Sequence, residues 1–196
     1  APPSERLAVH AGSGEAGLEP EVFFPAFAVA EASGPLEFYD HLGPRSVRMI
    51  DRLFPIRTLA NAAGGLVSAE IGARGSGTNY VQSADSSALA LASACQELED
   101  GLCDAALAIG CDSLLDPSTY LAYRGMDLLS PSAADKAYRP FDQDRNGLVL
   151  GEGAGVLVLE RAEDIRRRQG RALGWIIGVG CASDLGDSME PADPVA

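Results

Sequence analysis

Residues 78–98 read TNYVQSADSSALALASACQEL, and within this stretch a strand turns directly into a helix. The first part, 78–83, has the composition of a short β-strand. The second part, 85–98, carries leucine and alanine at helical spacing. One acidic residue, Asp85, marks the junction. A strand that feeds a helix is the repeating unit of layered α/β folds, and the stretch therefore predicts that class.

The sequence on both sides of this unit continues the alternation of apolar and amphipathic runs. Gly64 and Gly65 fall inside an expected helix, where tight backbone packing would explain them. Asp116 is expected to cap a helix that has Pro117 in its first turn. The order of elements predicts an α/β fold in which a mostly parallel sheet has helices on both faces. Strands are expected at 6–12, 78–83, 103–112, 153–160 and 173–183, and helices at 58–71, 85–98, 116–123 and 160–170.

The chain is acidic, since its 196 residues include 15 Lys+Arg against 28 Asp+Glu, a net charge of −13. Binding phosphates requires clustered positive charge, so neither nucleic acid nor a membrane surface is an expected partner. The basic cluster of Arg166, Arg167, Arg168 and Arg171 fits the solvated last turn of a helix. No apolar run approaches the roughly 20 residues of a membrane span, and the start APPSERLAVH has no signal-peptide core.

The cysteines Cys95, Cys103, Cys111 and Cys181 are scattered without a CxxC pair, and the chain has two histidines. This usage argues against a zinc site and against a disulfide scaffold. It predicts buried thiols in a reducing cytoplasm. We expect no metal and no cofactor.

Asp85 has three interpretations at its strand-to-helix junction. Asp is among the best helix caps, because its carboxylate accepts free N–H groups and complements the helix dipole. The same geometry presents nucleophiles in α/β enzymes, and it could also hold a residue that has replaced one. Activated carboxylates are rare, so the residues alone favour the cap.

The run FDQDRNGLVLGEGAG (141–155) imitates the start of an EF-hand calcium loop. Such a loop needs a bidentate acid at its twelfth position, which is glycine here, with the glutamate one residue early. Its GEGAG segment lacks the Lys-Ser/Thr of a phosphate loop. We therefore expect a structured turn in which acids pair with an arginine and glycines let the backbone pass closely. Its residues of interest are Asp142, Arg145, Gly151, Glu152 and Gly153.

A serine hydrolase built from Ser13 with His10 or His41 is the other catalytic interpretation. Ser13 does not stand in a G-x-S-x-G elbow. His10 lies in an apolar strand, where core packing is expected, and His41 is expected at the surface. The pattern does not favour this chemistry.

The segments of the chain, in their order, resemble the N-terminal half of the β-ketoacyl synthase (condensing enzyme) family, which has the thiolase-like layered fold. The most specific pieces are FDQDRNGLVLGEGAGVLVLE (141–160) and the stretch around Asp85. The resemblance runs from Arg6 to Asp184. It implies a domain of residues 1–184, without the family's first strand and C-terminal half, and a polar tail at 185–196.

The resemblance places Asp85 where the family has its nucleophilic cysteine, because the family's D-T-A-C-S-S reads Q-S-A-D-S-S here. A carboxylate cannot form the thioester, so condensation is expected to fail. The family's two histidines, lysine and Gly-Phe-Gly-Gly loop belong to its C-terminal half. In family dimers the strand before the nucleophile pairs across the two-fold axis, which makes Asn79, Tyr80, Gln82 and Ser83 candidates for an acyl tunnel or an interface.

These implications predict a non-catalytic, chain-length-factor-like subunit. Its expected partner is an active ketosynthase, or a second copy of itself, in fatty acid or polyketide assembly, with acyl carrier protein as a further partner. Two alternatives stay open. Asp85 could serve an acyltransferase or malonyl decarboxylase, or the chain could be one half of a split synthase.

Overall fold

The computed structural model of the chain describes residues 2–14, 48, 52–53 and 59–182. Contacts divide the chain into two compact units, Ala1–Arg161 and Ala162–Ala196, and the first contains the sheet. The expected domain end at residue 184 and the polar tail lie outside the described residues.

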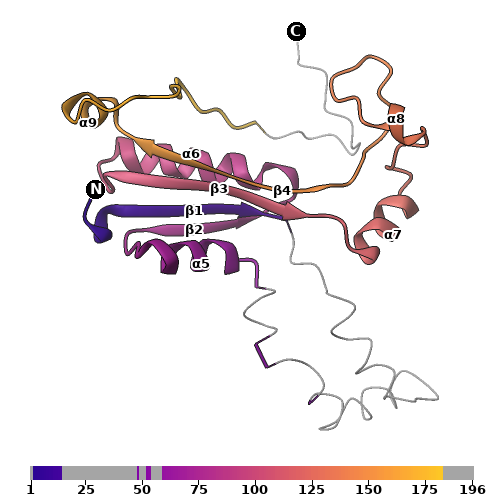
Figure 1. Ribbon diagram of the computed structural model, residues 1–196, viewed down its shortest axis with the longest axis horizontal. Coiled ribbons are helices and arrows are strands. Elements are labelled where there is room, and N and C mark those ends of the chain that lie inside the picture. The colour runs from indigo at the N-terminus through magenta and orange to yellow at the C-terminus, as the bar shows by residue number, and fades with distance from the viewer. Residues whose placement is uncertain (1, 15–47, 49–51, 54–58, 183–196) are drawn as a thin grey trace. The chain divides into compact units, whose positions relative to one another are not determined.

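A four-stranded sheet with the order β2-β1-β3-β4 forms the centre of the first unit (Figure 1). β1 pairs in parallel with β2 and β3, which confirms a mostly parallel sheet, whereas β4 runs antiparallel to β3. In this antiparallel register Glu152, the first residue of β4, lies opposite Ser113, the last residue of β3. The strands are β1 (Leu7–Ser13), β2 (Gly77–Val81), β3 (Ala105–Ser113) and β4 (Glu152–Glu160).

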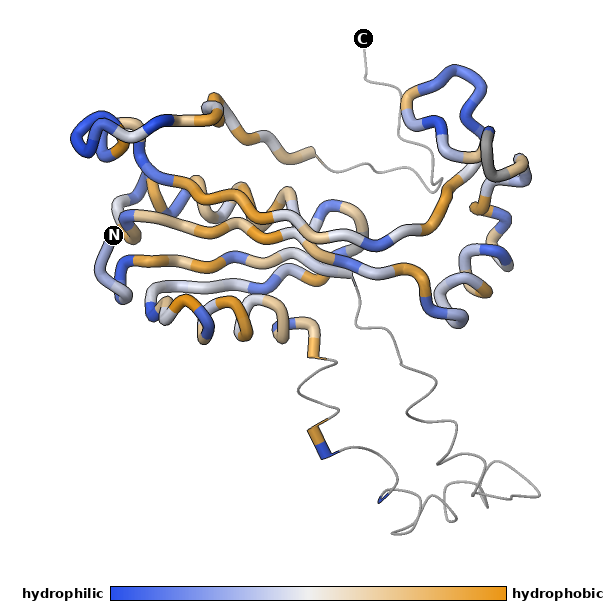
Figure 2. Tube along the Cα trace, viewed as in Figure 1, coloured by the Kyte–Doolittle hydropathy of each residue, from blue (hydrophilic) through white to orange (hydrophobic). Residues whose placement is uncertain are grey.

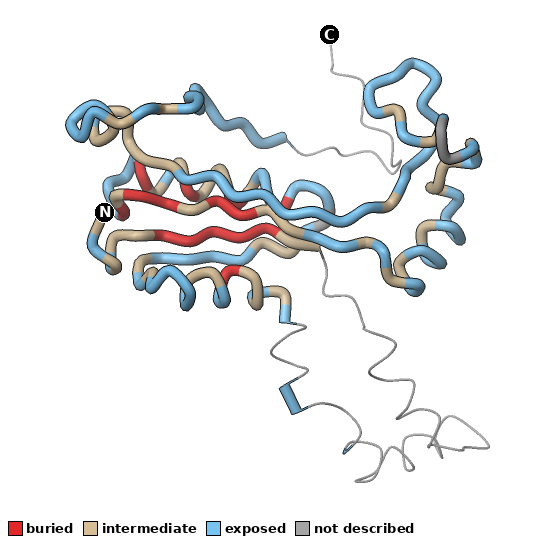
Figure 3. The backbone as a smooth tube through the Cα atoms, in the orientation of Figure 1, coloured by how far each residue is buried: buried red, intermediate tan, exposed pale blue. Residues whose placement is uncertain are grey.

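Helices α5 and α6 cover opposite faces of the sheet, as the sequence predicts (Figure 1). Side chains alternate along β1, so Ala8 packs with Ala94 of α6 while Val9 packs with Val67 of α5. Figure 3 shows the buried residues gathered on β1, β3 and α6. The helices are α5 (Ala62–Ile71), α6 (Ser86–Glu99), α7 (Pro117–Gly125) and α8 (Ala134–Ala137), and the 3-10 turns are η1 (Ser4–Arg6) and η2 (Ser83–Asp85).

The two glycines inside α5 lie in different surroundings. A Cβ on Gly64 would lie 2.5 Å from Asn79 Oδ1 and 3.3 Å from Ala11 Cβ, so this face of the helix touches the sheet closely. Gly65 has no heavy atom within 4 Å of such a Cβ. Tight packing therefore explains the first glycine and does not explain the second.

The predicted cap of α7 is confirmed. Asp116 lies at its start in an extended backbone conformation, and its Oδ1 accepts the N–H of Thr119 at 2.9 Å. Hydrogen bonds from Ser118 and then from Thr119 lower the pKa of Asp116 to about 2, because both favour the ionised carboxylate.

An ionic network joins the ends of three strands around Asp104. Arg6 donates two hydrogen bonds of 2.8 Å to this carboxylate, and Arg161 donates a third at 3.0 Å. Arg161 also donates to the carbonyl oxygens of Leu98 and Cys103. The hydrogen bond from Arg6, followed by that from Arg161, lowers the pKa of Asp104 to about 2. The network thus ties the starts of β1 and β3 to the end of β4.

Strand β4 is apolar and yet exposed (Figures 2 and 3). Val156, Leu157 and Val158 expose 51%, 52% and 68% of their surface. Consecutive side chains of a strand point to opposite faces, so apolar surface is open on both sides of this edge of the sheet.

The second unit contains α9 (Ala162–Arg167), in which Arg167 pairs with Asp164 at 2.8 Å. Arg166 and Arg167 lie in its last turn, as expected. The strand expected at 173–183 is wrong for the described residues, since 173–182 have no regular secondary structure. A strand requires a ladder partner, and no described strand pairs with this segment. No helix among the described residues has the length and apolar character needed to cross a membrane.

Candidate functional site

The turn between β2 and α6, residues 82–86, is called the elbow here, and it carries Asp85 on its surface. Asp85 stands at the N-cap position of α6, as predicted, but its side chain makes no capping hydrogen bond, so the expected bond to the free N–H groups is wrong. The reason lies in the backbone. Asp85 has φ −97° and ψ −3°, which is nearly helical, whereas a capping residue is normally extended so that its oxygen meets the free N–H groups.

Ser86 closes the elbow instead. Its side chain is 3% exposed, and its Oγ accepts the N–H of Gln82 at 2.7 Å and donates to the Gln82 carbonyl oxygen. One hydroxyl thereby satisfies both backbone groups of the residue that leaves β2. Nothing in the sequence distinguishes Ser86 from its neighbour Ser87, so its role emerges only from the geometry.

Two glycines of the sheet let the elbow approach it. A Cβ on Gly12 would lie 2.3 Å from the Ser86 carbonyl carbon and from Ser87 N. A Cβ on Gly110 would lie 2.8 Å from Ser87 Cβ. Ordinary contacts begin at about 3.4 Å. The start of α6 therefore lies directly on β1 and β3, which a larger residue at either glycine would prevent.

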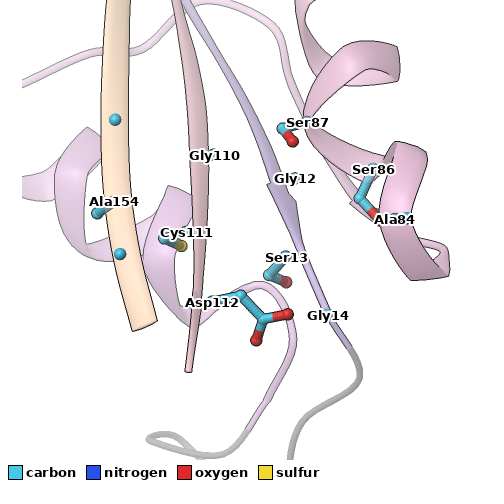
Figure 4. A pocket seen from close by; sticks show the side chains of 12 residues that line it. Gly12, Ser13, Gly14, Ala84, Ser86, Ser87, Gly110, Cys111, Asp112 and Ala154 are labelled. Atoms are coloured by element: carbon cyan, nitrogen blue, oxygen red, sulfur yellow. The ribbon is translucent and has the colours of Figure 1, made fainter. Parts of the chain in front are cut away.

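A hollow of about 350 Å³ lies beside the elbow (Figure 4). It is placed at the carboxyl ends of β1 and β3, the edge where open α/β sheets hold their ligands. Ala84 and Ser86 line it, but Asp85 between them does not. The lining residues are Gly12, Ser13, Gly14, Ala84, Ser86, Ser87, Gly110, Cys111, Asp112, Gly153, Ala154 and Gly155.

Cys111 brings a thiol to this hollow, and its surroundings keep that thiol protonated. Burial raises the pKa of Cys111, and the nearby charge of Asp112 raises it further. The reactive form of a cysteine is the thiolate, which a raised pKa disfavours. The side chains of Ser13 and Asp112 meet the hollow from β1 and β3 (Figure 4). The hollow thus offers hydroxyls, a neutral thiol and a carboxylate.

His10 is the only histidine among the described residues, and it is fully buried in β1. Its ring lies against Glu97 of α6 and does not line the hollow. The expected core position of His10 is confirmed. Ser13 lines the hollow and donates to the Ala60 carbonyl oxygen at 3.4 Å, so it does not pair with His10, in line with the sequence pattern, which does not favour a serine hydrolase. His41 lies outside the described residues.

The interface candidates lie on and after β2, the edge strand. Tyr80 is half-buried, and its hydroxyl shares a hydrogen bond with Ser93 Oγ of α6. Asn79 and Gln82 are exposed, and Ser83 lies in the 3-10 turn. Tyr80 thus fastens α6 to the sheet, while an interface or tunnel role for these residues stays a prediction.

The turn of the 141–155 segment is held by backbone groups. Asp142 Oδ1 accepts the N–H of Asp144 at 2.8 Å, while Arg145 donates to the Asp142 carbonyl oxygen at 3.1 Å. No contact of Arg145 with a carboxylate is seen in this turn, so the expected pairing with acids is wrong in detail. Gly147 has φ +123°, and a Cβ there would lie 2.7 Å from Ser130 N. The close passage of backbone is confirmed at this glycine.

The end of the same segment joins the loop to the hollow. Gly151 accepts the N–H of Leu114 through its carbonyl oxygen, and Glu152 accepts the hydroxyl of Ser113 at 3.0 Å. Gly153 lines the hollow. Among the described residues, no group of three His, Cys, Asp or Glu is placed to hold a metal ion.

The fold is a layered α/β fold, and its elbow is a strand-to-helix turn that carries Asp85 on the surface next to the hollow. Residues 15–165 match the family "Beta-ketoacyl synthase, N-terminal domain". The chain belongs to the β-ketoacyl synthase family.

Known proteins resemble the chain over most of its length. Nodulation protein E of Rhizobium sp. (strain N33) is 35% identical over 136 residues, which cover 69% of this chain and 33% of that protein. The 3-oxoacyl-[acyl-carrier-protein] synthase 2 of Mycobacterium bovis is 29% identical over 194 residues, or 97% of this chain and 46% of the relative. The chain thus spans between a third and a half of the length of these curated relatives.

Solved structures agree on the fold. A β-ketoacyl synthase from Burkholderia phymatum STM815 matches with a TM-score of 0.62 and 24% identity, covering 85% of this chain and 38% of that one. A type II polyketide synthase complex, AntDE:AntF, matches with a TM-score of 0.62 and 15% identity over 86% of this chain and 42% of that one. The thiolase-like α/β fold is therefore shown.

Proposed function

We propose that this chain is a non-catalytic ketosynthase-like subunit that pairs with an active β-ketoacyl synthase in fatty acid or polyketide assembly, in the manner of a chain-length factor. Asp85 carries the proposal. The resemblance of Q-S-A-D-S-S to the family's D-T-A-C-S-S supports placing it at the nucleophile position of the exposed elbow, and a carboxylate cannot accept an acyl chain as a thioester.

The chemistry of the hollow supports this proposal. Its thiol, Cys111, has a raised pKa and thus little thiolate. The one described histidine, His10, is buried away from the hollow and cannot act there as a general base. All four cysteines are free, which suits the cytoplasmic setting that we propose.

The edges of the sheet support a partner. β4 exposes three consecutive apolar side chains, Val156, Leu157 and Val158. At the opposite edge, Thr78 and Asn79 of β2 are exposed beside a strand that pairs only with β1 among the described strands. Open strand edges readily pair with another chain. We propose an active ketosynthase as this partner, with a second copy of the chain as the competing occupant.

Contact with acyl carrier protein is proposed to run through the partner. In the AntDE:AntF structure, an acyl-carrier protein is in complex with its ketosynthase. A chain with a net charge of −13 repels another acidic protein, so docking would fall to the active subunit.

The test is reconstitution with an active ketosynthase, malonyl-loaded carrier protein and an acyl primer. We expect the chain alone to give no condensation, the mixture to elute as a hetero-complex, and product length to change when the chain is present. The Asp85→Cys variant should also be inactive alone. An active parent chain would contradict the absence of a nucleophile, and a chain that neither binds the synthase nor alters product length would contradict the partner role.

One half of a split synthase is the second candidate, and the exposed apolar strand β4 supports it, because a companion polypeptide could cover that edge of the sheet. Adding the C-terminal half of a related synthase as a separate polypeptide to the Asp85→Cys variant distinguishes the two functions. Condensation in that mixture, together with no effect on an intact synthase, would favour the split synthase.

A further inference from the structure

The middle of α6 packs on the sheet through alanine, and Leu98 joins the same core near the end of the helix. Ala90 and Ala94 of α6 are 0% exposed, and they lie over a sheet whose buried residues include Ala106 and Ala108 of β3. Small side chains interlock little. A core that has the right volume but lacks complementary side-chain packing can stay stable while its helices and strands no longer adopt one unique arrangement. The alanine contacts on their own therefore do little to fix α6 along its axis.

A polar contact to a buried histidine interrupts this apolar packing. His10 is 0% exposed, and its Nε2 lies 3.2 Å from Oε2 of Glu97, whose side chain is 20% exposed. The distance is that of an ion pair, although neither ring nitrogen meets hydrogen-bond geometry with a described group. Ser76, just before β2, donates its hydroxyl to the same Glu97 oxygen. Glu97 is thus held from β1 and from the approach to β2 at once.

This contact is the last of three along one side of α6. Ser86 bonds Gln82 at the elbow, Ser93 bonds Tyr80 in the middle, and Glu97 meets His10 near the end. Positions 86, 93 and 97 lie on one face of a helix, because they follow its period of 3.6 residues. The polar face meets β2, the approach to β2 and His10 of the neighbouring strand β1, while Ala94 and Leu98 pack in the apolar core.

We propose that the buried His10 and the partly exposed Glu97 form a polar lock that fixes the position of α6 along its axis and, through the helix, the geometry of the elbow. A polar pair with a buried member contributes little net stability compared with well-packed apolar residues. Its best-attested use is to specify register, as a single buried asparagine does in a coiled coil. The inference is independent of the proposed function, since it holds for a catalytic or a silent chain.

The test compares unfolding with hydrogen exchange in the full chain. The double variant His10→Leu with Glu97→Met replaces both partners by apolar side chains. We expect its unfolding midpoint in urea to equal or exceed that of the parent chain. We also expect the Gln82 amide, which is bonded to Ser86 Oγ, to exchange at least tenfold faster, while the amides of β3 keep their rates. NMR signals of residues 82–87 should divide into more than one set.

Glu99→Gln is the matched control, because it removes a carboxylate from the exposed side of the same helix. It should leave the exchange of the Gln82 amide within twofold of the parent. The proposal is overturned if the double variant also stays within twofold and shows a single set of signals. Failure of the double variant to fold would also overturn the proposal, because the lock is proposed to fix the position of α6 and not to add net stability.

Discussion

Replacing Gly12 by alanine tests the idea that close approach to the sheet holds the elbow in place. The new Cβ would lie 2.3 Å from the Ser86 carbonyl carbon, 2.3 Å from Ser87 N and 2.4 Å from Ser86 O. All three atoms belong to the backbone of the first turn of α6, so no side-chain rotation relieves the overlap. Either the helix or β1 must move.

The magnitude follows from the overlap. Ordinary contacts begin at about 3.4 Å, so each of these atoms is at least 1 Å too close. Overpacking a core costs about 1–3 kcal/mol, and a backbone obstacle places Gly12→Ala at the upper end, about 3 kcal/mol. For a chain of this size, that loss lowers the melting temperature by about 6–12 °C.

Gly65→Ala is the matched control, since the same change is made where no atom lies within 4 Å. Alanine is favoured over glycine inside a helix, so this variant should gain about 0.5–1 kcal/mol. Gly64→Ala should fall between the two, because the obstructing Asn79 Oδ1 belongs to an exposed side chain that can rotate. Urea unfolding followed by circular dichroism measures all three. A Gly12→Ala variant within about 0.5 kcal/mol of the parent would refute the close-approach argument.

Three further predictions concern polar groups. Arg6 and then Arg161 lower the pKa of Asp104 to about 2 by donating hydrogen bonds to its carboxylate, so the ionised carboxylate stabilises the fold above about pH 4. This contribution is lost as the pH falls toward 2. The Asp104→Asn variant should therefore show a smaller difference between its urea midpoints at about pH 5 and about pH 2.5 than the parent chain, and an unchanged difference would contradict the prediction. Asp116→Ala should cost about 0.5–2 kcal/mol through loss of the α7 cap while Asp116→Asn keeps the cap, and equal melting temperatures for the two variants would count against it. Ser86→Ala leaves the backbone groups of Gln82 without their partner and should cost about 1–3 kcal/mol; unchanged protection of the Gln82 amide would show that another group satisfies it.

The fold was largely predictable because its elements are long and strongly patterned. The strand at 103–112 and the helix at 85–98 were expected almost as they occur, as β3 and α6. The segment 173–183 has an equally strong apolar pattern and was wrongly expected to form a strand. A strand needs a neighbour to form its hydrogen bonds, and sequence pattern reports the apolar faces without reporting whether a neighbour exists.

The site was less predictable than the fold. The sequence pattern located the strand-to-helix turn, but the contacts within the turn depend on its backbone angles, which the pattern does not report. The sequence placed Asp85 at the elbow, and the expectation that it caps α6 rested on its residue type alone. The preceding 3-10 turn gives it a nearly helical backbone, and Ser86 makes the closing hydrogen bonds instead. No pattern in the sequence announces a 3-10 turn of three residues. Cys111 and Asp112 were missed as lining residues for a related reason, since their strand brings them to the hollow only through its register with β1.

The residues that hold the elbow in place are different from the residue at position 85. Gly12 and Gly110 are required because the start of α6 lies on the sheet, and Ser86 is required because Gln82 must be satisfied where β2 ends. None of these demands involves the side chain at residue 85, which lies outside the hollow and makes no capping bond. The fold can therefore keep the whole elbow whatever residue stands at that position. An intact elbow therefore reports how α6 packs on the sheet, and the proposed loss of the nucleophile rests separately on the identity of residue 85.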